Sequence, residues 1–183
     1  GCLGSREHLT LQDIVFDNCI SEGNAANSGL GGALFVGAGL ADGAFTGARP
    51  DVMMNNVRVR NSKALRGAHP STPAGGGVVL GSGGPGDPAA NPIVAPSGTQ
   101  VGSVVMTDVV IENNEAEAIG GLRVRQATSV AMTRVTINGN RATGAFDANP
   151  NLPAGRTDDV AVFGNRGSVA LSRLWPGRAD RLI

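Results

Sequence analysis

Apolar residues recur at four fixed positions in five segments of the chain, which begin at His8, Asp51, Ser103, Ser129 and Ser168. When the second residue of each segment is counted as offset zero, offsets zero, two, five and seven are apolar in the first four segments. The fifth segment keeps three of these positions. The columns are Leu9, Val52, Val104, Val130 and Val169; Leu11, Met54, Met106, Met132 and Leu171; Ile14, Val57, Val109, Val135 and Leu174; and Phe16, Val59, Ile111 and Ile137.

The spacing of these columns predicts strands. Residues two apart on a strand face the same side, so offsets zero and two form one inward pair and offsets five and seven another. The odd step between the two pairs requires a bend of about two residues. Polar residues fill it, such as Gln12-Asp13 and Asn55-Asn56, and they are compatible with a turn. A helical period of 3.6 does not fit the columns.

A polar corner follows the second pair, with Asn18, Asn61 and Asn113 at offset nine and Gly139 in the fourth segment. Asparagine can turn a chain sharply and hydrogen-bond its own backbone. Stacked in successive coils, the three amides would form a ladder along the axis. The alternative is three isolated turn asparagines, and the shared column favours the ladder.

A third strand, introduced by glycines, completes each coil. It reads GGALFV from Gly31, GGGVVL from Gly75 and GGLRV from Gly120, with a weaker version, DDVAVFGN, from Asp158. The shortest coil takes the 26 residues from Val104 to Val130. We expect one all-β domain over residues 1–183, a solenoid of about five coils of three short strands, with loop insertions near 37–50, 81–100 and 143–157.

Two of the corners carry a resemblance to a known family. Phe16-Asp17-Asn18-Cys19 and Ile111-Glu112-Asn113-Asn114 each precede a strand that starts with Gly-Gly. This pairing resembles the repeats of polymorphic outer-membrane proteins and autotransporters, and it is similar to the wider pectin-lyase-like superfamily. Over most of residues 8–175, the resemblance implies a right-handed single-stranded parallel β-helix. It implies little about activity, because the superfamily holds adhesins, passenger domains, lyases and hydrolases.

Composition narrows the choice of core and partner. The chain has 28 glycines, 3% aromatic residues and 16% charged residues, so the core must consist of small aliphatic side chains. The 15 basic and 15 acidic residues cancel, without a run of either sign. We therefore expect no nucleic-acid partner, and no apolar stretch reaches the roughly 20 residues of a transmembrane helix.

Two cysteines, Cys2 and Cys19, bear on the compartment. Their spacing fits no metal site, and the simplest interpretation is two unpaired small residues, with a disulfide as the open alternative. The start of the chain has no signal-peptide pattern, so we expect any export signal to lie outside this sequence. The family resemblance implies an extracytoplasmic location, either secreted, at the cell surface or at the outer membrane.

The outward surface and the ends are the candidate contact regions. We expect Leu34, Val36 and Val79 to face outward as an apolar patch, covered either by the chain's own insertions or by a partner. No capping helix is visible at either end, although solenoids generally need caps. We therefore expect a fragment or subunit whose open ends meet further coils of the same protein or other subunits.

Candidate chemistry is sparse. Asp158 and Asp159 faintly resemble the paired aspartates of polygalacturonase-type β-helices, but the other residues of that signature are missing, and adjacent strand residues point to opposite faces. We assign these two residues to a solvated corner and expect no catalytic residue. No cofactor is expected, and Ca²⁺ at the acidic corners lacks a supporting motif.

Three classes of function remain. The preferred hypothesis is a non-catalytic extracytoplasmic scaffold, adhesion or structural surface module. The first alternative is a polysaccharide lyase or glycoside hydrolase of the pectin-lyase-like fold, with a polysaccharide as its partner. The second is a structural subunit that packs onto a larger complex.

Overall fold

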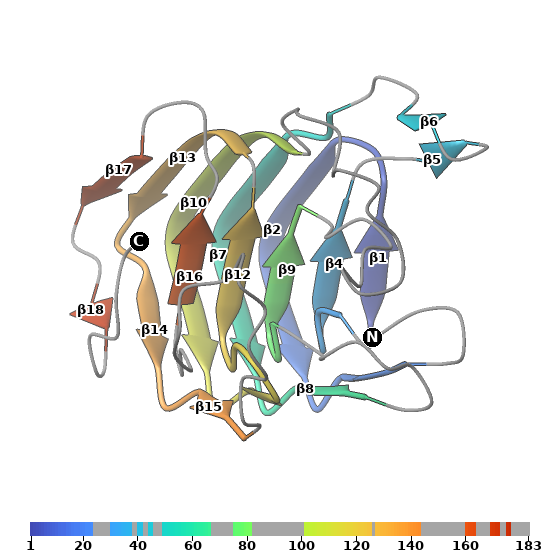
Figure 1. Cartoon of the computed structure of the whole chain (residues 1–183). Helices are drawn as coiled ribbons and strands as arrows, with labels where there is room; N and C mark the ends of the chain where they lie inside the picture. The colour runs from blue at the N-terminus through green and yellow to red at the C-terminus, as the bar shows by residue number, and fades with distance from the viewer. Residues whose placement is uncertain are drawn as a thin grey trace.

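Three parallel β-sheets, stacked coil upon coil, contain most of the described strands (Figure 1). The computed structural model describes residues 1–23, 30–37, 40–41, 44–45, 49–66, 75–81, 101–125, 127–143, 160–163, 169–172 and 175–176. All regular secondary structure within these residues is β-strand. The chain is therefore all-β and forms a solenoid.

The strands of the three sheets alternate along the chain. The front sheet contains β1 (Leu3–Ser5), β4 (Leu34–Val36), β9 (Val78–Leu80), β12 (Leu122–Arg125) and β16 (Val160–Phe163). The long sheet contains β2 (Leu9–Asp17), β7 (Val52–Arg60), β10 (Val101–Glu112), β13 (Ala127–Thr133), β14 (Thr136–Asn138), β17 (Val169–Ser172) and β18 (Trp175–Pro176). The base sheet contains β3 (Ile20–Glu22), β8 (Lys63–Leu65), β11 (Glu115–Ala116) and β15 (Arg141–Ala142).

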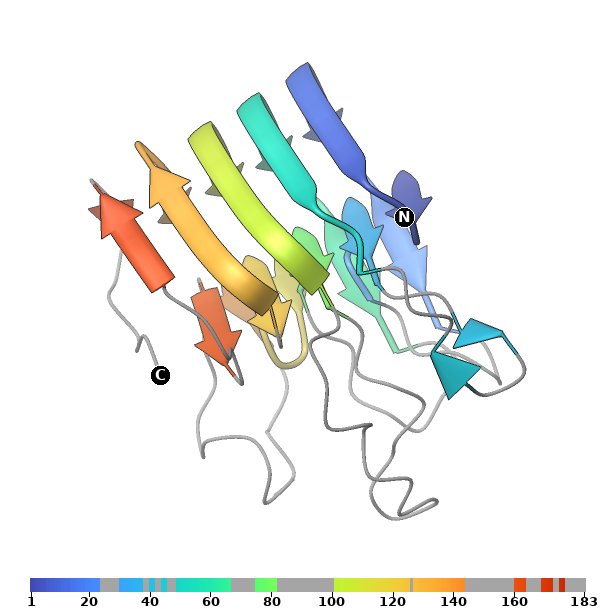
Figure 2. The same ribbon diagram turned by 90° about the horizontal axis from the view of Figure 1, so that it is seen from above.

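The long sheet confirms the predicted register. Leu9, Val52, Val104, Val130 and Val169 are consecutive register partners. Seen from above, the long strands lie side by side along the stack, with β2 at one end and β17 at the other (Figure 2). In the insertion at 37–50, β5 (Leu40–Ala41) and β6 (Ala44–Phe45) form a separate antiparallel pair.

The inward columns of the long sheet form the core together with the front sheet. In β7, the residues at offsets zero, two, five and seven are buried, and the residues between them are exposed. The four offsets therefore point inward, as predicted. Met54, Met106 and Ile111 are fully buried, and burial of a side chain of this size contributes about 1.5–3 kcal/mol. Leu9 and Ile14 are only partly buried, because β2 has β7 as its one neighbour among the described strands.

Both predicted bends adopt the left-handed backbone conformation. At the first, Asp13, Asn56, Asp108 and Arg134 have φ of 55°, 50°, 55° and 52°. At the second, Asn18, Asn61, Asn113 and Gly139 have φ of 55°, 54°, 55° and 61°. Asn, Asp and Gly tolerate this region best, which explains why they occupy seven of these eight positions.

Glycine at the start of the front strands allows the coils to approach closely. A Cβ on Gly76 would lie 2.4 Å from the carbonyl oxygens of Glu115 and Gly120. A Cβ on Gly32 would lie 2.0 Å from the carbonyl oxygen of Gly76. The predicted glycine-led strands are thus confirmed as β4, β9 and β12, and the glycines are needed for contact between neighbouring coils.

The side-chain directions predicted for β4 are wrong. Leu34 and Val36 are fully buried in the core cluster, and Phe35 between them is the outward residue. The register explains the error, because Leu34 pairs with Val78 and Val36 with Leu80, which are both inward. Val79 pairs with Phe35 and does lie in the outward column, yet it is fully buried as well.

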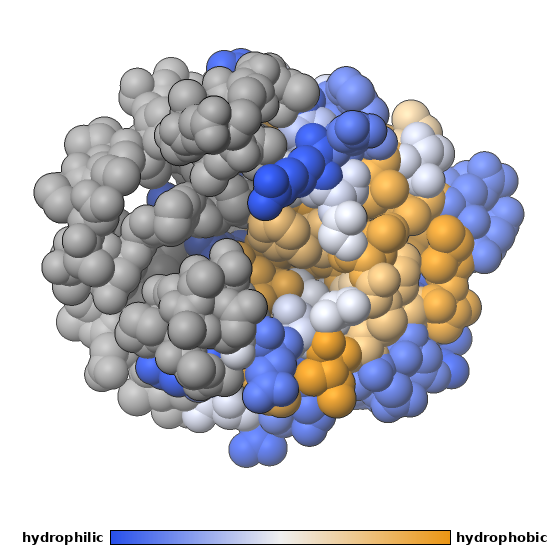
Figure 3. Space-filling model, turned by 90° about the vertical axis from the view of Figure 1, so that its right-hand side faces the viewer, coloured by the Kyte–Doolittle hydropathy of each residue, from blue (hydrophilic) through white to orange (hydrophobic). Residues whose placement is uncertain are grey.

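Figure 3 shows the end of the stack at which β1 and β2 lie. Apolar residues gather over this end, with polar residues around them. Partly buried Leu3, Leu9 and Ile14 pack against the core there. Val15 and Ile20, with 59% and 55% of their surface exposed, belong to the outer faces of β2 and β3.

Candidate functional site

A groove follows the corner between the long sheet and the base sheet. Its volume is about 370 Å³, and it is open to solvent. The residues that line it are Asn18, Asn61, Lys63, Asn113, Asn114, Glu115, Gly139 and Arg141. All eight lie at the second bend of a coil or within two residues after it, so the repeat itself builds the groove from one coil to the next.

A buried ladder of hydrogen bonds forms the floor of this corner. The Asn140 Oδ1 accepts hydrogen bonds from the Asn114 backbone N–H at 3.0 Å and from its Nδ2 at 2.9 Å. The Asn114 Oδ1 accepts the Ser62 N–H at 2.9 Å, and the Ser62 Oγ accepts the Cys19 N–H at 3.3 Å. Each coil thus satisfies a buried backbone donor of the preceding coil.

The predicted asparagine column lies one residue before this ladder. Asn18, Asn61 and Asn113 are exposed, and no hydrogen bond joins their side chains to one another in the described part of the chain. Asn18 and Asn61 both donate from Nδ2 to Asp17 Oδ1, at 3.0 and 2.9 Å. These asparagines shape the bend, whereas the amide ladder runs through the next position.

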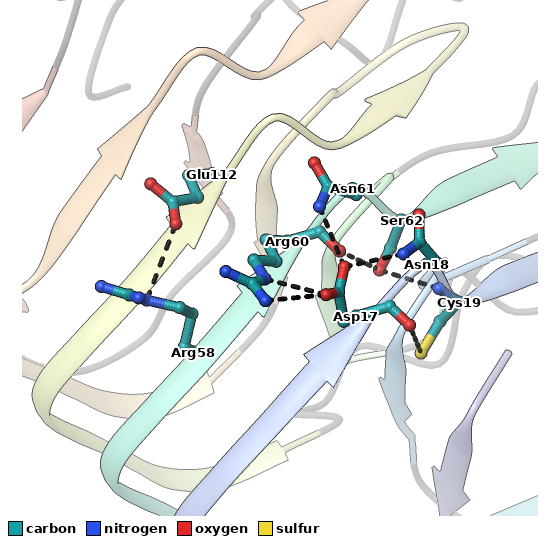
Figure 4. Close-up of polar contacts among 8 residues, drawn as sticks. All are labelled: Asp17, Asn18, Cys19, Arg58, Arg60, Asn61, Ser62 and Glu112. Carbon is teal, nitrogen blue, oxygen red and sulfur yellow. Dashed lines mark hydrogen bonds and ion pairs between the residues drawn. The ribbon is translucent and has the colours of Figure 1, made fainter.

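Charged side chains on neighbouring coils pair along the axis (Figure 4). The Arg60 Nη2 lies 2.8 Å from Asp17 Oδ2, and the Arg58 Nε lies 3.6 Å from Glu112 Oε1. At the first bend, Arg134 donates from Nε and Nη2 to the two oxygens of Asp108, both at 2.6 Å.

The base sheet repeats this arrangement. The Lys63 Nζ lies 3.6 Å from Glu115 Oε1, and Arg66 donates from Nε to the Glu117 Oε1 at 3.0 Å. Arg141 is the register partner of Glu115 on the following coil, so positive and negative residues alternate along this column. Opposite charges at partner positions favour the observed register over a shifted one.

Three of the carboxyl groups, those of Asp17, Asp108 and Glu117, have a lowered pKa. A hydrogen bond from Asn61, together with the Arg60 guanidinium, holds the pKa of Asp17 below its ordinary value. The hydrogen bonds from Arg134 lower the pKa of Asp108 in the same way. Both groups therefore stay ionised around neutral pH, and they differ from a general acid, which needs a raised pKa.

A buried arginine lies on the outer face of the front sheet. Arg123 of β12 shares the outward column with Val79 and is only 8% exposed. Burial, with a contribution from the charge of Arg125, lowers the pKa of Arg123 to about 10. Part of this outer face is thus shielded from solvent around Val79 and Arg123.

The two cysteines form a disulfide, which corrects the preferred expectation of unpaired residues. The Sγ atoms of Cys2 and Cys19 are bonded, and their Cα atoms are 5.6 Å apart. Cys19 occupies the same position as Ser62 and Asn114 in their coils, beside the front sheet that carries β1. The spacing of the two cysteines does not indicate that they lie close together, because only the path of the coil brings residue 2 back to residue 19.

The candidate catalytic residues Asp158 and Asp159 lie outside the described residues. Within the residues that are described, no group of three or more His, Cys, Asp or Glu side chains is arranged to hold a metal ion. The same part of the chain contains no helix long and apolar enough to cross a membrane. His8 accepts a hydrogen bond at Nδ1 from the Asp51 N–H at 3.1 Å, a contact between coils.

Sequence analysis missed the buried ladder of Ser62, Asn114 and Asn140. A signal was present, because polar residues recur at offset ten in three of the segments. The signal is weaker than that at offset nine, because offset ten carries Ser62, Asn114 and Asn140 and not one residue type. The chain matches no family model, and no curated protein or solved structure shows a significant similarity to it.

Proposed function

We propose that this chain is a non-catalytic scaffold module of an extracytoplasmic protein, built as a right-handed parallel β-helix of about five coils. The described strands form parallel sheets in a shared register. The proposal adds the right-handed turn of the coils and the fold of the pectin-lyase-like superfamily. The corner asparagines and glycine-led strands of this chain resemble the repeats of polymorphic outer-membrane proteins.

The axial pairing of charges is the observation that carries this proposal. Asp17, Asp108 and Glu117 each receive a side-chain hydrogen bond from an arginine on another coil. Their pKa values are lowered, which favours permanent negative charge over proton transfer. In the described coils, these outward arginine and carboxylate side chains therefore join one coil to another, which a rigid scaffold requires.

The disulfide supports the extracytoplasmic part of the proposal. Disulfides persist in oxidising compartments and are rare in the cytosol, where thiols are kept reduced. The Cys2–Cys19 bond is internal to one coil, so it can stabilise this module without a partner chain.

Thiol labelling of intact producing cells tests the location. A membrane-impermeant maleimide should label the protein only after treatment with a charged, impermeant phosphine, because the two thiols are paired outside the cytoplasm. Labelling that requires cell lysis and needs no reductant would contradict the proposal. The Cys2→Ser, Cys19→Ser double variant provides the unlabelled control.

A turnover assay separates the scaffold from the lyase or hydrolase alternative. We expect the purified chain to leave acidic polysaccharides unchanged, as followed by the release of unsaturated or reducing ends. Turnover that is lost in Asp159→Asn and kept in Asp108→Asn would overturn the scaffold proposal. Asp108 is the matched control because its carboxylate is held by Arg134 at an exposed bend.

A further inference from the structure

Strand β1 is held in the front sheet by few noncovalent contacts. It has three residues, and β4 is its one neighbour among the described strands. The Leu3 N–H donates to the Ala33 carbonyl at 3.0 Å, and the Gly37 N–H donates to the Ser5 carbonyl at 3.1 Å. Leu3 is only partly buried, and Gly4 contributes no side chain.

The rest of the same coil is anchored much more firmly. Strand β2 pairs with β7 over its whole length, and it places Leu11 and Phe16 in the core. At the corner, the Asn18 N–H donates to the Arg60 carbonyl at 3.2 Å, and the Lys63 N–H donates to the Cys19 carbonyl at 2.8 Å. These contacts do not depend on β1.

The disulfide joins these two unequal parts. Cys19 is 3% exposed and belongs to the core cluster, whereas Cys2 is exposed. A buried free cysteine behaves as a small apolar residue, so Cys19 would keep its place in the core after the bond is cleaved. Cys2 would lose its covalent attachment. The order of β1 would then depend on the backbone hydrogen bonds to β4 and Ala33, the contact of the amino terminus with the Ile20 carbonyl, and partly buried Leu3.

We propose that the Cys2–Cys19 disulfide is a redox latch that holds β1 against the edge of β4. When a dithiol reductant cleaves the bond, β1 leaves the front sheet, while β2 and β3 remain in place. The backbone groups of β4 that face β1 then become an open sheet edge. The inference does not depend on the proposed function, because it concerns the purified chain alone.

The reaction is a thiol–disulfide exchange at the exposed sulfur. A thiolate of the dithiol attacks Cys2 Sγ, the Sγ–Sγ bond breaks, and Cys19 leaves as a thiolate that takes up a proton. The second thiol of the reductant then attacks the reductant sulfur that is bonded to Cys2 Sγ. This step releases the Cys2 thiolate, which is also protonated. Two electrons and two protons pass from the dithiol, which ends as a cyclic disulfide.

The expected effect on β1 is large. The bond closes a loop with a sequence separation of 17 residues. Because β2 stays in place, only the stretch between Cys2 and Leu9 is free to disorder, and a cross-link over a loop of that length changes its equilibrium by on the order of 100-fold. Reduction should therefore convert β1 from a docked strand to a segment that opens readily.

Hydrogen exchange of single backbone amides, followed by NMR, tests the latch. The Gly37 amide reports on β1, because it donates to Ser5. The Gly81 amide donates to the Val36 carbonyl at 2.8 Å and reports on the next coil, and the Asn18 amide reports on the corner after β2. On reduction, we expect exchange at Gly37 to become roughly 100-fold faster, with little change at Gly81 and Asn18.

Two outcomes would overturn the proposal. Equal protection of Gly37 before and after reduction would mean that β1 does not need the disulfide. Equal acceleration at Gly37 and Asn18 would mean that the coil unfolds as one unit and not at β1. The Cys2→Ser, Cys19→Ser variant should exchange like the reduced protein with and without reductant, which separates loss of the bond from other effects of the reagent.

Discussion

The buried amide of Asn114 should be the most important polar side chain in the described coils. Its Oδ1 accepts the Ser62 N–H, and its Nδ2 donates to the Val59 carbonyl at 3.3 Å and to Asn140 Oδ1. Asn114 is 1% exposed and Ser62 is fully buried, so water cannot easily replace the lost partners. Asn114→Ala removes all three side-chain hydrogen bonds at once.

The magnitude follows from the groups that lose a partner. A buried donor left unsatisfied costs about 1–3 kcal/mol, and each further hydrogen bond contributes about 1 kcal/mol. With the Ser62 N–H unsatisfied and two amide bonds lost, we expect the free energy of unfolding to fall by about 3–5 kcal/mol.

Asn113 is the matched control, because it lies next to Asn114 and is exposed. At its φ of 55°, alanine should cost about 1 kcal/mol and glycine close to nothing. Urea unfolding followed by far-UV circular dichroism measures both variants, with an unchanged m value as the check on comparable transitions. Equal losses in Asn114→Ala and Asn113→Ala, or the reverse order, would refute the assignment of the ladder to offset ten.

Three further variants test packing and electrostatics. Gly76→Ala should prevent close contact between coils, with a loss above about 3 kcal/mol or failure to fold, as measured by thermal unfolding. Met106→Ala should cost about 2–5 kcal/mol, whereas Val105→Ala, on the outer face, should cost below about 1 kcal/mol in the same urea assay; similar losses would contradict the inward columns. Arg134→Gln should raise the pKa of Asp108 towards its ordinary value of 3.8 in an NMR titration, and an unchanged pKa would exclude Arg134 as the cause. Because the folded pKa is depressed, the stabilisation from this carboxylate is present above that ordinary value and is lost as the pH falls through the folded pKa.

The repeating columns determined the class of fold and most of the core. Inward residues such as Met54 and Met106 were assigned correctly. With a two-residue bend between two strand segments, all four apolar positions can face the core only in one arrangement. The left-handed bends were also predictable, because Asn, Asp and Gly recur where the chain must turn.

The facing of β4 was not predictable in the same way. It has three apolar residues, Leu34, Phe35 and Val36, so the sequence shows no alternation of apolar and polar positions. Pairing with β9 decided the direction, because each register partner must share its neighbour's face.

The asparagine ladder and the disulfide depended on the tertiary structure for a related reason. Offsets nine and ten both carry polar residues, and only the direction of the chain after the bend decides which one points into the core. Sequence alone determined the parallel stack, since the same apolar offsets recur in successive coils although the coils differ in length. The three-dimensional path decided that Asn114 is buried beside Asn140 and that Cys2 returns to Cys19, because such contacts depend on how each coil closes.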